Sequence, residues 1–130
     1  MGRTVILVDD GLAIGTTLRA AIRALRGREP ARIVAAVPVA APETCAAISE
    51  EADEAVCAAR SRDFHAVGFW YENFSQTSDE EVRALLEAAR SDAFDASDSP
   101  TRRARQAVNA VARGPSRIRT WARPVMSRLL

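Results

Sequence analysis

Lysine is absent from this 130-residue chain, and all 18 of its basic residues are arginine. The absence excludes any phosphate loop or active site that depends on a lysine side chain. Histidine and cysteine are also scarce. The single histidine is His65, and the two cysteines, Cys45 and Cys57, do not have the spacing of metal ligands. The sequence therefore argues against a zinc site.

Long apolar runs are missing too. No stretch of the sequence approaches the roughly 20 apolar residues of a membrane-spanning helix, and the N-terminus lacks the charged-then-apolar pattern of a signal peptide. These absences make the cytoplasm the expected compartment. In that reducing environment Cys45, expected on a helix, and Cys57, expected on a strand, are predicted to be small core residues.

Charge is unevenly distributed along the chain. Ten arginines stand against all 17 acidic residues up to Asp98, whereas eight arginines and no acid follow it. Such asymmetry between two parts of a chain indicates a separate interaction role for the basic end. The length suits one domain, and a content of 48% hydrophobic residues is typical of a chain that folds.

Strands and helices are predicted to alternate in the first half of the chain. Three short apolar runs predict strands, and they cover Thr4–Val8, Ile33–Val39 and Glu54–Ala58. Such runs are typical of strands buried on both faces of a parallel sheet. Apolar residues at helical spacing from Leu18 to Leu25 predict a helix that ends at Gly27, and Pro42 opens a second helix. This order predicts an α/β fold with a parallel doubly wound sheet.

Aromatic residues gather in one later segment. Phe64 to Phe74 contains most of them, and we expect a short strand followed by a loop there. Ser78 and Glu81 form a capping-box pattern that predicts the start of a further helix. Residues 91–100 have the composition of a polar linker.

Residues 101–130 are expected to form a basic amphipathic tail, either helical or disordered. Four interpretations remain open for it. The tail could be a partly disordered extension, or an amphipathic helix that rests on an anionic membrane surface through Trp121 and its apolar neighbours. Alternatively, it contacts nucleic acid or packs on the acidic body of its own chain.

The loop after the first predicted strand has the composition of an anion site. Asp9 and Asp10 end the strand, and the loop that follows leads directly into a helix. Backbone N–H groups at a helix N-terminus bind phosphate, a glycine permits close approach, and hydroxyl groups add donors. The candidate phosphate-binding residues are Ala13, Ile14, Gly15, Thr16 and Thr17. Two carboxylates beside them can accept hydrogen bonds from the hydroxyls of a sugar, so the loop predicts a ribose 5-phosphate pocket.

The segment Val5 to Thr17 resembles the signature of type I phosphoribosyltransferases, which has four apolar residues, two acids, a variable pair and then Ala-Thr-Gly-x-Thr. By this resemblance, Asp9 and Asp10 are the catalytic acids and hold the ribose 2′- and 3′-hydroxyls, while Ala13 to Thr17 hold the 5-phosphate. The family usually has threonine where this chain has Ile14. We therefore expect weaker phosphate binding here.

A second segment, Phe64 to Gln76, resembles the closing segment of bacterial phosphoribosyltransferase-like proteins, some of which are fused to hydrolase domains of the dienelactone type. The resemblance spans about Arg3 to Arg90. It implies that Phe69, Trp70 or Tyr71 stacks on a base. Packing of these rings in the core is the competing interpretation.

The resemblance also implies a function. The protein is expected to bind phosphoribosyl pyrophosphate or a nucleotide, and to transfer the phosphoribosyl group to or from a nitrogenous base. Mg²⁺ would arrive with the pyrophosphate of the substrate and not through direct ligation by the protein. Catalysis in the family rests on positioning and on stabilising an oxocarbenium-like transition state.

The family has a strand with a pyrophosphate loop and a mobile catalytic loop before its Asp-Asp strand, and neither is found here. We therefore expect residues 1–90 to be the C-terminal part of such a domain, incomplete at the N-terminus. The chain is then a fragment, one half of a split protein with a complementing N-terminal half, or a reduced member that pairs as a homo-oligomer or with another subunit. Two other functions remain open. One is a non-catalytic module that binds a nucleotide or ribose phosphate, and the other is an interaction protein acting through its Arg-rich tail.

Two other families place acids at the end of a strand. Response-regulator receiver domains bind magnesium there, but they also need a later phosphoacceptor aspartate and a lysine, and the second strand of this chain ends in Val37-Pro38-Val39. A Walker B strand needs a Gly-Lys phosphate loop elsewhere in the chain. The lack of lysine argues against both. His65 is expected to be a packed or surface residue and not a general base.

Overall fold

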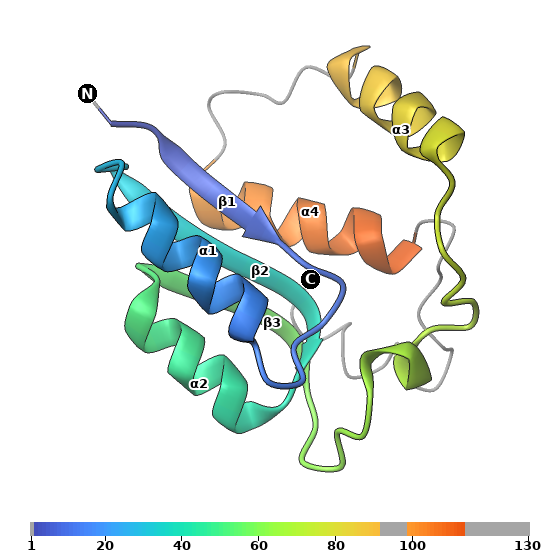
Figure 1. Ribbon diagram of the computed structural model, residues 1–130, viewed down its shortest axis with the longest axis horizontal. Helices are drawn as coiled ribbons and strands as arrows, with labels where there is room; N and C mark the ends of the chain where they lie inside the picture. The colour runs from blue at the N-terminus through green and yellow to red at the C-terminus, as the bar shows by residue number, and fades with distance from the viewer. Residues whose placement is uncertain (1, 92–98, 114–130) are drawn as a thin grey trace.

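The computed structural model describes residues 2–91 and 99–113, which form a parallel sheet with helices on both faces (Figure 1). The strands are β1 (Thr4–Val8), β2 (Arg32–Ala40) and β3 (Glu54–Arg60), in the spatial order β1-β2-β3. The α-helices are α1 (Thr16–Arg26), α2 (Pro42–Glu51), α3 (Asp79–Ser91) and α4 (Pro100–Arg113), and a 3-10 helix, η1, spans Val67–Trp70. The α/β class and the parallel sheet confirm the prediction from hydrophobic periodicity.

The register of the sheet aligns the ends of β2 and β3, because Ala40 at the end of β2 pairs with Arg60 at the end of β3. Strand β1 ends earlier, where Val8 pairs with Ala36 within β2. Nearly all of β2 is buried, whereas β1 is half-buried in its middle and exposed at both ends. Full burial of the first strand was therefore a wrong expectation, because β1 lies at an edge of the described sheet and β2 lies at its centre.

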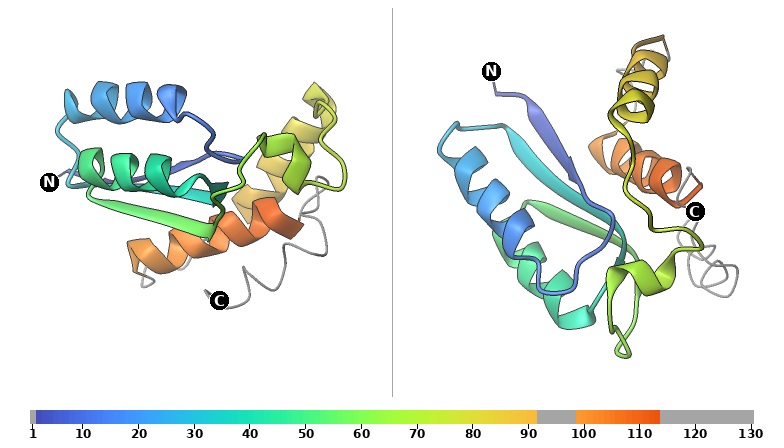
Figure 2. Two further views of the ribbon diagram at one scale, coloured as in Figure 1. Left: turned by 90° about the horizontal axis from the view of Figure 1, so that it is seen from below. Right: turned by 45° about the vertical axis from the view of Figure 1, so that its right-hand side comes forward.

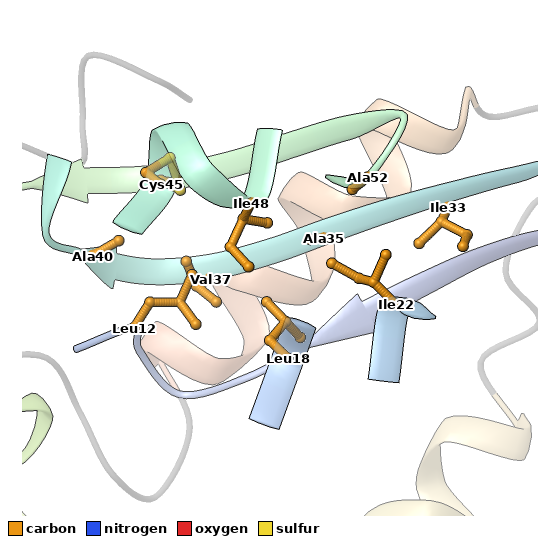
Figure 3. Packing of buried hydrophobic residues seen from close by; sticks show 11 residues of the cluster. Leu12, Leu18, Ile22, Ile33, Ala35, Val37, Ala40, Cys45, Ile48 and Ala52 are labelled. Atoms are coloured by element: carbon orange, nitrogen blue, oxygen red, sulfur yellow. A yellow bond between two sulfur atoms is a disulfide. The ribbon is translucent and has the colours of Figure 1, made fainter. Parts of the chain in front are cut away.

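Helices α1 and α2 cover one face of the sheet, as Figure 2 shows when the sheet is seen along its edge. Their buried side chains meet those of the strands in one apolar cluster, drawn in Figure 3. The cluster contains Leu12, Leu18, Ile22, Ile33, Ala35, Val37, Ala40, Cys45, Ile48, Ala52 and Cys57. Because alternate residues of β2 point to opposite faces, Ile33, Ala35 and Val37 belong to this cluster while Val34 and Ala36 face the other side.

Helix α4 covers the opposite face (Figure 2). Its Ala104 and Val108 are buried in a second cluster that also contains Trp70 and Tyr71 from η1 and its C-terminal neighbour. The first part of the basic segment is thus a helix that packs on the sheet of its own chain. Residues 114–130, including Trp121, lie outside the described residues, so the membrane and nucleic-acid interpretations of the tail stay predictions.

The aromatic segment does not contain the short strand that we expected. Its backbone instead turns through η1, where the N–H of Phe69 donates to the carbonyl of Ala66 at 3.2 Å and that of Tyr71 to Gly68 at 3.3 Å. These local bonds replace a sheet ladder. The turn directs Trp70 and Tyr71 inward, onto the face of the sheet that α4 covers.

Helix α3 begins with the predicted capping box. The N–H of Glu81 donates to Ser78 Oγ at 3.2 Å, and the N–H of Ser78 donates to Glu81 Oε2 at 3.0 Å. Its apolar residues Val82, Leu85 and Leu86 are nevertheless exposed, because α3 stands away from the sheet (Figure 1).

Cys45 of α2 and Cys57 of β3 are bonded to each other as a disulfide. Both residues are buried, as the prediction of core residues required. The bond between them was not predicted from the sequence. The two cysteines meet because α2 packs on the face of the sheet against β3. The bond joins α2 covalently to β3.

Ion pairs join α1 to the end of α2. Glu51 accepts from Arg19 at 2.5 Å and from Arg23 at 3.1 Å, and Arg26 donates to Asp53 at 3.0 Å. The arginine side chains are partly exposed, so solvent screens these ion pairs and each contributes little to stability. Within residues 2–91 and 99–113, no helix is both long and apolar enough to cross a membrane.

Candidate functional site

The acid pair lies where β1 leaves the sheet. The N–H of Asp9 still donates to the carbonyl of Ala36 on β2 at 3.3 Å, while the N–H of Asp10 turns back to Asp9 Oδ1 at 2.9 Å. Both acids are half-buried. The chain therefore leaves the strand between the two residues, and their carboxylates come from one tight turn at the carboxyl ends of the strands, where α/β proteins bind ligands.

Burial raises the pKa of the Asp10 carboxyl above its ordinary value, and the neighbouring charge of Asp9 raises it further. Two carboxylates held so close repel each other when both are ionised. Hydrogen-bond donors or a developing positive charge placed between them would relieve this repulsion. The electrostatics of the turn thus suit hydroxyl donors and electron-poor carbon better than an anion.

The loop from Ala13 to Thr17 is open to solvent. Ala13, Ile14, Thr16 and Thr17 are exposed or partly exposed, and Ile14 reaches 80% exposure. Gly15 precedes α1 in a left-handed conformation, with φ of 78°, and its carbonyl accepts the first helical bond from Arg19 at 3.0 Å. The N–H groups of the first helical turn have no carbonyl partners within the helix, so they are available to an anion.

Helix α2 supports this loop from behind. Thr44 Oγ1 donates to the carbonyl of Ala13 at 2.7 Å. A Cβ atom on Gly15 would lie 2.8 Å from Thr44 Cγ2 and 3.7 Å from Ile48 Cδ1, so a larger residue fits there only if the Thr44 side chain moves. Thr44 is a site residue that sequence reasoning missed. Its place in the first turn of a helix that begins at the carboxyl end of a strand could have suggested it.

Between the acid pair and Ala13 the loop is fixed to β2. The N–H of Leu12 donates to the carbonyl of Val39 at 2.9 Å, and the N–H of Ala41 donates to the carbonyl of Leu12 at 3.1 Å. The Leu12 side chain is buried in the cluster under α1 and α2. These bonds hold the two parts of the site at a constant separation.

The three candidate stacking residues lie in different surroundings. Phe69 is 56% exposed, whereas Trp70 and Tyr71 are buried. Trp70 stacks on Phe64 with ring centroids 6.2 Å apart, and Tyr71 packs against Phe74 at 5.3 Å. Of the three rings, Phe69 is the one that a base can reach in this structure, and its stacking role stays a prediction.

Tyr71 reaches the acid pair from the α4 face of the sheet. Its hydroxyl donates a short hydrogen bond to the backbone carbonyl of Asp10. Burial raises the pKa of the Tyr71 phenol, and the charges of Asp10 and Asp9 raise it further, so the hydroxyl keeps its proton and remains a donor. The structure therefore joins Tyr71 to the acid pair through its hydroxyl. His65 is exposed, on the stretch of chain that leads into η1.

Asp9 and Asp10 are the acids that lie on the loop itself. In the part of the chain that the structure describes, no group of three or more histidine, cysteine, aspartate or glutamate side chains could hold a metal ion. The site offers two adjacent carboxylates beside a phosphate-type loop. Because Mg²⁺ usually binds through one or two carboxylates together with the phosphates of a ligand, this set of donors fits a metal that arrives bound to a phosphorylated ligand. The role of Mg²⁺ stays a prediction.

Comparison with known proteins shows the family of this chain. The model of the phosphoribosyl transferase domain matches residues 1–72, which include the acid pair, the loop from Ala13 to Thr17, Thr44 and Tyr71. Two proteins from Mycobacterium tuberculosis strains, CDC 1551 / Oshkosh and H37Rv, each named "Putative phosphoribosyl transferase", are 42% identical over 104 residues, which is 76% of this chain and 24% of each relative. The chain thus spans about a quarter of the length of these curated relatives.

A solved structure agrees with this assignment. The crystal structure of TT1426 from Thermus thermophilus superposes with a TM-score of 0.60 at 44% identity, covering 65% of this chain and 40% of that one. The thirteen-residue loop, the parallel sheet and the domain match point to the same conclusion. This chain belongs to the phosphoribosyl transferase family.

Proposed function

We propose that the chain binds the ribose 5-phosphate part of phosphoribosyl pyrophosphate or of a nucleotide, and takes part in moving the phosphoribosyl group to or from a nitrogenous base. One observation carries the proposal. A pair of half-buried acids and an exposed phosphate-type loop lie on a single turn between the end of β1 and the start of α1.

Each part of the turn has its own task. The loop from Ala13 to Thr17 offers backbone N–H groups and two hydroxyls to the 5-phosphate. Asp9 and Asp10 accept hydrogen bonds from the ribose hydroxyls and orient the ring. Their mutual repulsion makes a sugar that gains positive charge in the transition state a better ligand than the neutral sugar, which is how a binding site becomes a catalytic one.

Mg²⁺ belongs to the substrate in this proposal. Bound to pyrophosphate, it neutralises charge on the leaving group. The described residues of this chain hold the ribose and its phosphate, and the exposed ring of Phe69 is the proposed platform for the base.

Calorimetric titration tests the proposal. The folded chain is titrated with phosphoribosyl pyrophosphate plus Mg²⁺, and separately with ribose 5-phosphate. We expect saturable binding of both, weakened about tenfold or more in Asp10→Asn because a charged acceptor is lost. Unchanged affinity in the double variant Asp9→Asn/Asp10→Asn would refute the hydroxyl-binding role of the acids.

Transfer is measured separately from binding. Release of pyrophosphate from phosphoribosyl pyrophosphate is followed with a set of purine and pyrimidine bases as acceptors. Release that depends on one base supports the transferase proposal. Binding without release by any base supports the second candidate, a non-catalytic module that holds a ribose phosphate or nucleotide.

Ile14 is the observation that favours this second candidate. It is an 80% exposed apolar side chain at the place where the phosphate would lie, and it contributes no donor. Ile14→Thr adds a hydroxyl, and we expect it to tighten ribose 5-phosphate binding about fivefold, the value of one neutral hydrogen bond. Ile14→Val is the matched control, since it changes size without adding a donor.

A further inference from the structure

We propose that Tyr71 is a positioning residue for Asp10, and that it sets the hydroxyl-binding side of the site independently of the phosphate-binding side. The inference rests on the proposed function and adds the residue that governs recognition of the sugar hydroxyls. Tyr71 does not touch the ligand itself. It acts through the Asp10 backbone.

The hydrogen bond from Tyr71 fixes one peptide plane. Its hydroxyl donates to the carbonyl of Asp10, so the peptide that joins Asp10 to Gly11 is held in one orientation. The direction in which the Asp10 side chain leaves the backbone depends on that orientation. The Tyr71 ring is 1% exposed and lies against Phe74, which leaves the hydroxyl little freedom to move.

The segment that carries Tyr71 also packs against Gly11, at the other end of this peptide. A Cβ atom on Gly11 would lie 2.8 Å from Val67 Cγ1 and 3.1 Å from Val39 Cγ1. Val67 begins η1 and Tyr71 follows it. The turn that carries Asp10 is therefore held between the end of β2 and a segment far along the chain, since the Tyr71–Asp10 bond spans 61 positions.

The phosphate side is held by a different element. Thr44 on α2 bonds the carbonyl of Ala13, and Thr44 and Ile48 pack under Gly15. These residues belong to the cluster on the α1/α2 face or adjoin it, whereas Tyr71 belongs to the cluster on the α4 face. Because separate layers of the fold support the two halves, a change in one support should leave the other half intact.

The first experiment compares Tyr71→Phe with Thr44→Val. Each variant removes one hydroxyl and keeps the shape of the side chain, and valine retains the methyl that packs on Gly15. Calorimetry gives the affinity of each protein for ribose 5-phosphate and for 2-deoxyribose 5-phosphate, and hence the preference for ribose.

We expect the ribose preference of Tyr71→Phe to fall about tenfold. Without the tyrosine hydroxyl the Asp10 carboxylate is no longer held in place, and its charge-assisted hydrogen bond to the 2-hydroxyl of ribose is lost. Thr44→Val should weaken both ligands by a similar factor and leave the preference unchanged. A general loss of structure would weaken both ligands alike, so the preference separates positioning from stability. A Tyr71→Phe protein with the full ribose preference would overturn the inference.

A second measurement needs no ligand. The pKa of the Asp10 carboxyl is followed by carbon NMR across the acid range, with Asp9 and Tyr71 as the groups that face it. In Tyr71→Phe the turn is released, and we expect the raised pKa of Asp10 to move toward its ordinary value of 3.8. In Thr44→Val it should stay raised. An Asp10 pKa that is the same in Tyr71→Phe and the unmodified protein would count against the inference.

Tyr71 is the only tyrosine in the sequence, which provides a third route that does not need a variant at this position. Protein labelled with 3-fluorotyrosine carries one fluorine signal. We expect this signal to shift as Asp10 is protonated, and the step to vanish in Asp10→Asn. A fluorine signal whose chemical shift does not change as Asp10 titrates would overturn the inference, even if Tyr71→Phe did not fold.

The outcomes distinguish this inference from the proposed function. If neither sugar phosphate binds but the Asp10 pKa falls in Tyr71→Phe, the positioning role stands and the ribose 5-phosphate assignment fails. If both ligands bind with a ribose preference that Tyr71→Phe retains, the proposed function stands and the role of Tyr71 fails.

Discussion

The two faces of the sheet are covered in different ways, and each supports a different half of the site. The α1/α2 face is covered by the helices that directly follow β1 and β2, joined by ion pairs and by the Cys45–Cys57 disulfide. The other face is covered by α4, which lies beyond the part of the chain that matches the family, and by the aromatic segment. We therefore expect phosphate binding to depend on the helices that directly follow β1 and β2, and recognition of the sugar hydroxyls to depend on the aromatic segment further along the chain.

This difference teaches where tolerance to change should lie. The α1/α2 face contains the hydrogen bond from Thr44 to the loop, the disulfide, and three ion pairs to Glu51 and Asp53. The α4 face contains small buried side chains on its helix and two large aromatic rings. We expect the first face to dominate stability and the second to dominate ligand selectivity.

The largest effect should come from Ile48, which is fully buried between α2 and the sheet. Ile48→Ala should lower the free energy of unfolding by about 2–5 kcal/mol, because it removes apolar contacts and leaves a cavity. Val108→Ala on α4 removes one carbon fewer from the other face, and its loss per removed carbon should be smaller. Urea denaturation of both proteins measures the two losses, and an equal loss per removed carbon would contradict the asymmetry.

Loss of the disulfide should follow in size. Cys45 and Cys57 are 12 positions apart, and closing a loop of this length stabilises a fold by about 3 kcal/mol in the chain-entropy description. Denaturation with and without reductant gives the difference, and mass spectrometry after thiol alkylation counts free thiols. The Cys45→Ala/Cys57→Ala protein should not respond to reductant. Full alkylation of the folded, non-reduced protein would show that the bond is not formed.

A smaller effect is expected where α4 is joined to the sheet. Thr101 Oγ1 donates to Glu54 Oε2 at 2.8 Å, and Glu54 also accepts from Arg32 at 2.7 Å. Thr101→Val should cost about 1 kcal/mol and loosen the first turn of α4, as hydrogen exchange of that turn would report. Thr101→Ser keeps the hydroxyl and should behave like the unmodified protein. A response as large as that of Ile48→Ala would reverse the proposed ranking of the two faces.

The smallest effects should appear in the pH dependence of stability. The pKa of Glu51 lies below its ordinary value of 4.5 because it accepts hydrogen bonds from Arg19, with Arg23 contributing as well. A depressed folded-state pKa contributes stability above the ordinary value, and that stability is lost as pH falls through the folded value. Asp10 has the opposite sign. Its raised pKa means that stability is lost as pH rises through the range above 3.8.

Unfolding experiments between about pH 3 and 7 cover the acid range in which both carboxyls titrate and test both signs. Glu51→Gln should flatten the loss of stability on the acid side. Asp10→Asn should make the protein slightly more stable at neutral pH, although we expect the same change to weaken ligand binding. A less stable Asp10→Asn protein at neutral pH would show that the carboxylate supports the fold, contrary to its raised pKa.

Sequence alone determined the order of elements and the chemistry of the loop. The alternation of apolar runs with helical spacing predicted β1 to β3 and the helices between them, because each element depends on neighbours a few residues away. The acid pair, the glycine and the threonines of the loop are contiguous in the chain, so their resemblance to the family could be recognised without a fold. The family assignment from that loop was confirmed.

Only the tertiary structure decided what holds this loop in place. Thr44 meets Ala13 across 31 positions, Tyr71 meets Asp10 across 61, and α4, which begins at Pro100, packs on a sheet whose last strand ends at Arg60. The expected strand in the aromatic segment was wrong because local hydrogen bonds through η1 direct Trp70 and Tyr71 onto the face of the sheet that α4 covers. Contacts of this kind form only when the helices and strands pack in three dimensions. The periodicity of apolar residues along the chain does not indicate which distant residues will then be neighbours.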